Sequence, residues 1–254
     1  MAAILHDIYR YPVKGMNGQR LETADIAPGA TIPGDRMFAL GRPGLEFDTD
    51  NPTWRPKTNF LALVRDARLA ELDTSYDDAT ASLTIRHDGE ERLCANLDSP
   101  EGRAATERFF GAFMADDISG PPTLLRAEGH SFSDLDAKVL SLINLETVRA
   151  LEAHTRAPLN PLRFRANLYV EGLEPRDEEG WEGRRITIGA VPFEVLLRTQ
   201  RCAATNVNPD TATRDINIPA ALQKNWGHAD LGVYLRALGG GAIRAGDQIM
   251  LGTS

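Results

Sequence analysis

The sequence contains few cysteines and no long hydrophobic run. Only Cys94 and Cys202 occur in 254 residues, which excludes a small secreted scaffold held together by several disulfides. No apolar run approaches the roughly 20 residues that a membrane-spanning helix needs. The N-terminus has no basic segment followed by an apolar core, so we predict no signal peptide. We therefore expect a cytoplasmic protein with two free thiols.

The sequence also lacks an excess of positive charge. The 28 basic and 36 acidic residues give a net charge of −8, the wrong sign for a general nucleic-acid binder. We thus predict neither a nucleic-acid nor a membrane partner. Only four of the basic residues are lysine, which leaves 24 arginines. Arginine binds phosphate and carboxylate through a planar fork, so an anionic ligand site remains compatible with the acidic net charge.

Several common catalytic signatures are missing. The chain has no GxGxxG after a predicted strand, and no Walker A, HExxH, CxxC or GxSxG motif. The five histidines are scattered without the spacing of metal ligands. These absences argue against nucleotide-binding folds, zinc peptidases, nucleophile-elbow hydrolases and thioredoxin-like enzymes.

The hydrophobic pattern predicts a β-rich α+β fold with a few helices. With 42% hydrophobic and 25% charged residues, the composition is that of a globular protein with one large or two small domains. Short apolar stretches between turn residues predict strands at 3–13, 19–26, 36–40, 60–64, 67–72, 81–86, 91–95, 164–170, 185–188, 192–197, 242–245 and 247–251.

Capping signals indicate where helices begin. Ser99 followed by Pro100 predicts a helix over 102–114, and Asn144 predicts a second helix that ends near His154. A third helix is predicted over 232–238, where three glycines follow.

Cys202 stands where the predicted strand 192–197 runs into a polar loop. Arg201 is adjacent and Arg198 is close in sequence. Neighbouring cations favour a thiolate, the form that attacks electrophiles or binds soft metals. A half-buried cysteine beside solvated arginines is the alternative interpretation. For Cys94, we expect a strand residue that faces the core.

Six motifs, in the same order along the chain, resemble the MOSC family (molybdenum cofactor sulfurase C-terminal domain). Those of the MOSC domain itself are the Arg-x-Asn segment 164–172, the Thr-Gln-Arg-Cys segment with the 205–211 run, the Leu-Gly-Val-Tyr segment 231–234 and the closing segment 241–249. Segments 11–15 and 34–36 resemble the β-barrel domain that precedes MOSC in the amidoxime-reducing branch.

The resemblance implies an N-terminal β-barrel domain over residues 1–120 and a MOSC-type barrel over 121–254. It further implies a molybdenum-pterin cofactor whose phosphate is bound by basic residues, and an enzyme that reduces N-hydroxylated or N-oxide compounds. In this branch one protein cysteine completes the molybdenum coordination. That residue is Cys202 in this sequence, because it matches the cysteine of the family motif.

The same resemblance assigns cofactor-binding roles to further residues. Lys14 and Arg36 match positions that neutralise the phosphate, and Arg165 and Asn167, expected on one face of a strand, match positions that hold pterin and phosphate. We predict that Lys14, Arg36 and Arg165 converge on one phosphate. The remaining predicted contacts are Gly15, through its backbone, Asn144, whose capping duty is an alternative explanation, and Thr199, Gln200 and Arg201.

The chain departs from the family at two places. Gly15 and Met16 replace a common Ser-Cys pair, and the segment 55–61 replaces the usual Gln-Arg before Pro-Arg-Leu. No cluster of cysteines occurs that could bind an iron–sulfur centre, so we expect a separate ferredoxin-, cytochrome- or flavin-reductase-type protein to supply electrons to a small-molecule reaction. A molybdenum cofactor or persulfide carrier that uses Cys202 remains the alternative.

Overall fold

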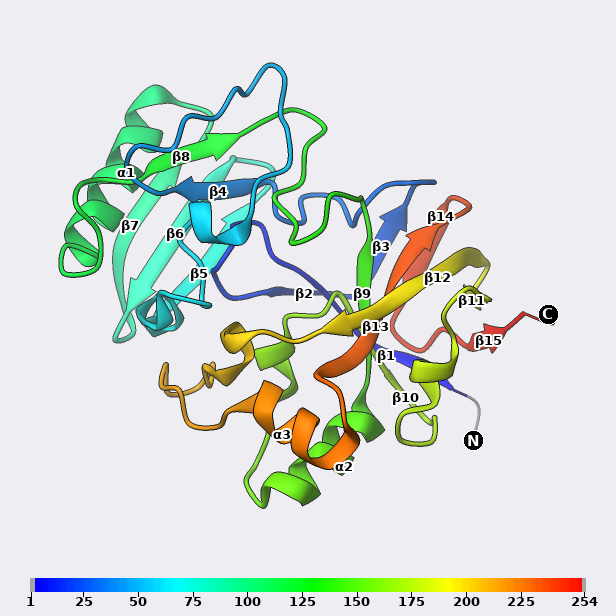
Figure 1. The fold of residues 1–254 in the computed structure, drawn as a ribbon. Coiled ribbons are helices and arrows are strands. Elements are labelled where there is room, and N and C mark those ends of the chain that lie inside the picture. Colours follow the sequence, from blue (N-terminus) through cyan, green and yellow to red (C-terminus); the bar gives the residue numbers. More distant parts are fainter. Residues whose placement is uncertain (1–2, 253–254) are drawn as a thin grey trace.

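The structure, a computed structural model, describes residues 3–252. Two lobes face each other in Figure 1, one containing α1 and β4 to β8 and the other built on the largest sheet. The strand order of this sheet is β15-β11-β12-β13-β9-β10-β1-β2, and all neighbouring pairs are antiparallel except β9 and β10. Its strands are β1 (Ile4–Arg10), β2 (Gln19–Leu21), β9 (Leu140–Asn144), β10 (Leu168–Glu171), β11 (Arg185–Ile188), β12 (Val191–Gln200), β13 (Asp230–Ala237) and β15 (Ile249–Leu251).

Two strands at the beginning of the chain pair with strands from its C-terminal half. Strand β1 pairs with β10, and β3 (Thr23–Ile26) pairs with β14 (Gly241–Arg244). Leu5 and Ile8 of β1 are completely buried in the same hydrophobic core as Val195 and Val233. The predicted division after residue 120 therefore separates β1 from its partner β10 and β3 from its partner β14.

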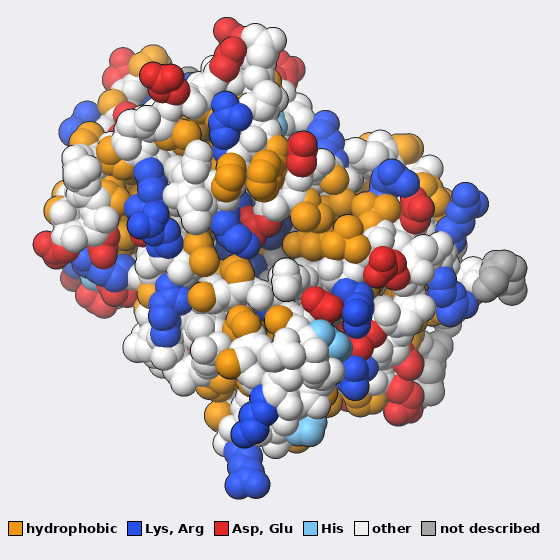
Figure 2. Space-filling model, viewed as in Figure 1, with side chains coloured by type: hydrophobic (Ala, Val, Ile, Leu, Met, Phe, Trp, Pro, Cys, Tyr) orange, Lys and Arg blue, Asp and Glu red, His pale blue; other side chains and the backbone are white. Residues whose placement is uncertain are grey.

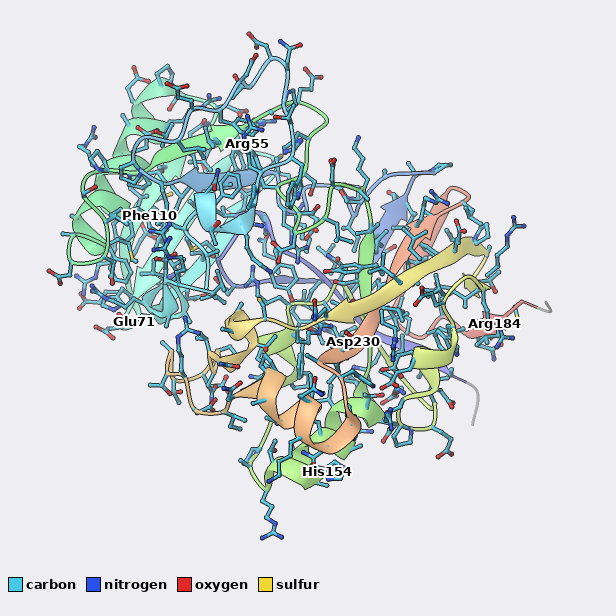
Figure 3. The ribbon with its side chains drawn as sticks, viewed as in Figure 1. Arg55, Glu71, Phe110, His154, Arg184 and Asp230 are labelled. Atoms are coloured by element: carbon cyan, nitrogen blue, oxygen red, sulfur yellow. The ribbon has the colours of Figure 1, made fainter. Side chains whose placement is uncertain are left out.

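The other lobe combines five strands and a helix. Strands β4 (Phe38–Gly41) and β8 (Thr123–Arg126) form one pair, and β5 (Leu72–Asp77), β6 (Ser82–His87) and β7 (Glu90–Asn96) form a meander. Helix α1 (Pro100–Phe113) packs against β7 and β8. Phe110 of this helix, labelled in Figure 3, is completely buried.

The two helices predicted from capping signals are confirmed. The Ser99 side chain accepts a hydrogen bond from the Gly102 backbone at the start of α1. The Asn144 side chain caps α2 (Leu145–Thr155) by accepting from the Glu146 backbone. Helix α2 lies in the crossover between the parallel strands β9 and β10, where such a connection is required.

The third predicted helix is wrong. Residues 232–238 belong largely to β13, whose residues Leu231, Val233, Leu235 and Ala237 are all buried with a spacing of two. The helix that the prediction missed is α3 (Ile218–Trp226), which begins with an Asn217 cap and a proline. Three α-helices in total occur within residues 3–252.

Three predicted strands are also wrong in whole or in part. Residues 60–64 contribute only an isolated bridge from Phe60. Residues 67–71 form a 3-10 helix that follows Asp66. The Asp66 carboxylate accepts hydrogen bonds from the Ala62 backbone and from Arg42. In the stretch 164–170, a 3-10 helix over Pro161–Phe164 precedes β10. Arg165 and Asn167 thus lie before the strand and do not share a strand face.

The prediction for Cys94 is wrong as well, because this residue of β7 is exposed.

The β-rich α+β class itself is confirmed. The large sheet is open, because its first and last strands, β15 and β2, do not pair with each other. An isolated antiparallel bridge joins Ile4 of β1 to Gln248, which directly precedes β15. Within residues 3–252, no helix is long and apolar enough to cross a bilayer.

Candidate functional site

A cavity of about 340 Å³ lies between the two lobes. Figure 2 shows basic and acidic side chains meeting in a hollow on this face, with hydrophobic side chains on either side. The volume falls in the range of sites for small molecules and cofactors. Seven lining residues are basic and one is acidic: Lys14, Arg36, Lys57, Arg163, Arg165, Arg198 and Arg201, with Asp134 as the acid. An acidic protein has therefore concentrated positive charge in one place.

Cys202 lies in this cavity, directly after β12. Cys202 has extended backbone angles and directly precedes the 3-10 helix Ala203–Asn206. Its side chain is partly exposed. The predicted position at the end of a strand is confirmed. Sγ of Cys202 is 3.3 Å from Nζ of Lys57, a residue that comes from the opposite lobe. The cysteine is thus accessible and has a cation beside its sulfur.

Arg201 does not extend toward the sulfur but into the protein. Its guanidinium donates to the backbone carbonyls of Leu231 and Phe164 and lies over the Phe164 ring. Burial lowers the pKa of Arg201. Among the described residues, no carboxylate lies within ion-pair distance of it.

Asp134 connects two of the four lysines of the chain. Its carboxylate oxygens lie 2.6 Å from Nζ of Lys14 and 3.0 Å from Nζ of Lys57. Burial opposes the negative charge, yet the two ammonium groups hold the pKa of Asp134 well below its usual range. For Lys57, burial would lower the pKa, but Asp134 and Cys202 outweigh it and raise the value. Lys14 is more deeply buried, which lowers its pKa overall.

Arg36 and Arg165 meet over the ring of Tyr11. Their guanidinium carbons lie 5.0 Å and 4.4 Å from the ring centroid, and Arg36 also donates to the Arg165 carbonyl at 3.1 Å. Burial opposes the charge of Arg36, but Asp35, Tyr11 and Asp134 hold its pKa above the usual value. Burial lowers the pKa of Arg165, whose side chain donates to the Met16 carbonyl and has no carboxylate partner among the described residues.

Both of these arginines have left-handed backbone conformations. The φ angles are 51° at Arg36 and 55° at Arg165. Such angles cost an L-residue about 1 kcal/mol or more, and they occur often at ligand sites. The structure thus brings Lys14, Arg36 and Arg165 to one cavity, and their contact with a phosphate stays a prediction.

Three other predicted residues, Gly15, Gln200 and Asn167, also line the cavity, but they differ in whether they have a polar side chain free to bind a ligand. Gly15 has a φ of 87°, and a Cβ there would lie 2.9 Å from the Leu61 carbonyl oxygen, so the position requires glycine. Gln200 is exposed at the cavity. Asn167 lines the cavity, but its amide is engaged by Ser141 and by the Tyr9 carbonyl.

Asn144 is not among the residues that line the cavity. It is completely buried, caps α2 and donates to the Glu174 carbonyl and to Glu178. The cofactor contact predicted for Asn144 is thus corrected to the helix-capping role, the alternative that its position before a helix also indicated.

The cavity residues to which sequence reasoning assigned no role include Lys57, Asp134, Arg163 and Tyr234. Lys57 had one usable signal, since lysine is rare in this chain. Asp134 lies in a loop without a motif, and only the fold brings it to Lys14. Burial raises the pKa of Tyr234, whose segment matched the family motif but was not assigned a role.

Unsatisfied polar groups in the cavity indicate that it is built for a ligand. The Thr199 hydroxyl and Nε of Arg163 are buried and have no hydrogen-bond partner, although each belongs to a lining residue. A buried polar atom without a partner costs about 1 to 3 kcal/mol. Together with Arg165 and Arg201, which lack carboxylate partners, these groups suit an anionic ligand that accepts hydrogen bonds. The cavity therefore fits a phosphorylated cofactor.

The donor set also fits a metal that arrives with ligands of its own. Within residues 3–252, no group of three or more His, Cys, Asp or Glu side chains could hold a metal ion. A single thiolate is a soft ligand, and it suits a metal that a cofactor already holds through sulfur.

The chain is similar to curated proteins of two kinds. The chain is 33% identical over 119 residues to a molybdenum cofactor sulfurase of Caenorhabditis briggsae, a stretch covering 44% of this chain and 16% of the relative. It is 26% identical over 126 residues to mitochondrial amidoxime reducing component 2 of Rattus norvegicus, covering 45% of this chain and 37% of the relative. The chain therefore spans less than half the length of these curated relatives.

Two solved structures are similar over different lengths. The YuaD protein of Bacillus subtilis covers 98% of this chain and 94% of its own, with 13% identity and a TM-score of 0.46. YiiM of Geobacillus stearothermophilus covers 45% of this chain and 54% of its own, with 20% identity and a TM-score of 0.36.

The family model of the MOSC domain matches residues 127–250. This segment contains β9 to β15, Arg165, Thr199 and Cys202. Residues 127–250 are therefore identified as a MOSC domain.

Proposed function

We propose that the protein is a molybdenum-cofactor-dependent oxidoreductase that reduces N-hydroxylated or N-oxide compounds. The observation that carries the proposal is one cavity that is lined by Cys202 and seven basic residues. The relatives named amidoxime reducing components support the reaction class.

We assign the lining residues to two parts of the cofactor, its phosphate and pterin on one side and its metal on the other. Lys14, Arg36 and Arg165 supply charge for the phosphate of the cofactor, and Gly15 offers a backbone approach. Thr199, Gln200 and Asn167 also line the cavity and are assigned to the pterin. Arg201 fixes the segment before Cys202 through its backbone contacts. Cys202 supplies the thiolate ligand of the metal.

When bound, the cofactor would supply a redox-active metal suited to oxygen-atom transfer. For a hydroxylamine-type substrate the overall reaction consumes two electrons and two protons, breaks the N–O bond and releases water. A separate ferredoxin-, cytochrome- or flavin-reductase-type protein provides the electrons. Lys57 lies beside Cys202, and Tyr234 also lines the cavity. We assign to both side chains hydrogen bonds to the substrate oxygen.

The test combines metal analysis, pterin release and an activity assay. Protein produced in a molybdate-replete host should contain stoichiometric molybdenum and pterin, and should reduce benzamidoxime with a chemical electron donor. Absence of metal and pterin after attempted reconstitution would contradict the proposal. Cofactor binding without any reduction would favour the second candidate.

The second candidate is a carrier of molybdenum cofactor or of persulfide sulfur on Cys202. The similarity to molybdenum cofactor sulfurases favours it. A carrier should transfer cofactor or sulfur to an acceptor apoenzyme, and this transfer should require Cys202.

We further propose that the large sheet is a MOSC-type barrel. Backbone hydrogen bonds from Leu5 to Asp247, from Gly246 to Leu5 and from Ile249 to Ala3, at 2.7 to 2.9 Å, support closure between β1 and the segment before β15. A preceding β-barrel domain is likewise proposed for the lobe of β4 to β8.

Cys202→Ala should abolish reduction and lower molybdenum retention without unfolding the protein. The side chain is partly exposed and lies in a loop, so its loss leaves no large cavity in the core. Metal content, turnover and the circular dichroism spectrum measure the three effects. Cys94→Ala is the matched control, and wild-type turnover by the Cys202→Ala protein would refute the ligand role.

A further inference from the structure

Lys57 places a cation directly beside the sulfur of Cys202. Its ammonium group has three N–H donors, and two of them face Cys202 Sγ at 3.3 Å and Asp134 at 3.0 Å. No third acceptor occurs among the described residues. The Lys57 side chain is 31% exposed, so a ligand that enters the cavity can reach this donor.

The charges near Lys57 do not cancel. Asp134 is the single acidic residue of the cavity, and Lys14 shares it with Lys57. Arg198 faces Glu179 and Asp230 only at 3.6 Å and 3.5 Å, distances longer than those of close charged hydrogen bonds. The region next to Cys202 therefore keeps positive charge that a ligand could neutralise.

An independent observation also indicates a ligand in the cavity. Thr199 is only 2% exposed, and its hydroxyl has no hydrogen-bond partner although the residue lines the cavity. An oxygen atom of a bound molecule would satisfy this donor.

Hydrophobic residues complete the description of the ligand. Leu63, Val64, Leu135 and Leu197 also line the cavity. Leu197 is 40% exposed and places apolar surface at the cavity. A molecule with a negatively charged end and an apolar body matches both features.

We propose that the Cys202 end of the cavity binds small organic anions, and that Lys57 determines this specificity by holding the negative group beside the sulfur. For the reductase, the substrate class is then an N-oxygenated compound that carries a carboxylate or another negative group near the reacting oxygen. This substrate class rests on the proposed function. The preference for anions at Cys202 does not, because it is a property of the protein without cofactor.

The test compares two alkylating reagents on cofactor-free protein. Iodoacetate and iodoacetamide both form a thioether with Cys202 and release iodide, but only iodoacetate is charged. Because both consume the same thiolate, the ratio of their rates reports attraction of the anion and not the amount of thiolate. Peptide mass spectrometry measures the ratio separately at Cys202 and at the exposed Cys94, which serves as the reference in the same molecule.

We expect the iodoacetate to iodoacetamide ratio at Cys202 to exceed that at Cys94 by about fivefold, the effect of a unit charge a few Å away in water. Lys57→Met should remove most of this excess, and Lys57→Arg should keep it. Lys224→Met, the same substitution on α3, should leave it unchanged. Added salt should reduce the excess in the wild type, because mobile ions screen the cavity charge.

A competition experiment tests the ligand itself. Benzoate should slow alkylation of Cys202 by iodoacetamide, and benzamide, which has a similar shape without the charge, should not. Lys57→Met should lose the protection by benzoate. Equal ratios at the two cysteines, an unchanged ratio in Lys57→Met, or equal protection by the two competitors would each overturn the inference. An anion preference in a protein that never reduces N-oxygenated compounds would instead refute the proposed function.

Discussion

Glu178 is a completely buried acid outside the cavity. One carboxylate oxygen accepts hydrogen bonds from Asn144 and Thr147, both at 3.0 Å, and the other has no partner. Burial raises the pKa of Glu178 to about 6 from its usual 4.5. The folded state therefore prefers the protonated acid, so this residue contributes stability below about pH 4.5 that is lost as the pH rises through about 6.

The expected size of this effect is about 2 kcal/mol between the two limits. Glu178→Gln removes the ionisation but keeps the shape of the side chain. Between pH 5 and pH 7.5, the free energy of unfolding of the wild type should fall by about 1 to 2 kcal/mol more than that of Glu178→Gln. Urea denaturation at both pH values measures the difference, with Glu182→Gln on the surface as the control. Parallel pH dependence of wild type and Glu178→Gln would contradict the assignment.

Arg36 supports the cofactor site through both its charge and its shape. Its guanidinium pairs with Asp35 and donates to the Arg165 carbonyl, so its removal loses a cation and loosens a second arginine. Arg36→Ala should lower cofactor occupancy about tenfold or more, because a charge-assisted hydrogen bond contributes about 1.5 to 3 kcal/mol. Lys14→Arg should lower it less, since the charge is retained. Pterin release per protein measures occupancy, and Arg185→Ala on the surface should have no effect.

Sequence reasoning identified the site residues that belong to a recognisable motif. Cys202 at a strand end and the basic residues Lys14, Arg36 and Arg165 could all be selected before the fold was known. The contact between Lys57 and Asp134 could not be predicted, because it spans 77 positions and depends on how the two lobes face one another. Arg165 was predicted on a strand because it lies in a short apolar stretch, yet the Asn160-Pro161 pair begins a helical turn that determines the local structure.

At the scale of the element, β13 shows how one glycine allows the central strands to approach. Gly232 has a φ of 79°, and a Cβ there would lie 2.4 Å from the Leu142 carbonyl oxygen of β9 and 3.2 Å from the Arg201 guanidinium. Gly232→Ala must separate the strands as well as adopt an unfavourable φ. We expect a loss of about 2 to 4 kcal/mol in the free energy of unfolding.

The control for this substitution isolates the backbone angle from the steric clash. Gly227, at the end of α3, has a similar φ of 81°, but a Cβ there meets no atom within 4 Å. Gly227→Ala should therefore cost only about 1 kcal/mol. Equal losses in the two variants, measured by urea denaturation, would show that the contact with β9 has no energetic effect.

Elements with a local signal were predictable, and elements that depend on distant contacts were not. The Ser99 and Asn144 caps are local, and α1 and α2 begin where these caps predicted. Residues 232–238 resemble a helix because glycines follow them, but pairing with β9 and β12 makes them a strand. Tertiary pairing in this case overrides the local signal.

At the scale of the whole molecule, the family domain depends on residues that precede it. The MOSC model covers residues 127–250, whereas β1 lies between β10 and β2 in the same sheet. Without β1, the edge of β10 would be unpaired and the hydrophobic core would lose Leu5 and Ile8. An exposed strand edge next to an incomplete core favours aggregation.

A fragment of residues 127–254 should therefore not unfold cooperatively on its own. It should bind the dye ANS and lack a near-ultraviolet circular dichroism spectrum, as expected for a compact state without fixed packing. Co-expression with a fragment of residues 1–126 should restore cooperative unfolding, because β1 can then pair with β10. The substitution Ile8→Asp in the second fragment should prevent this rescue, whereas Asp73→Asn, in the other lobe, should not. Cooperative unfolding of the isolated fragment, with the stability of the full chain, would show that β1 is dispensable for the sheet that positions Cys202.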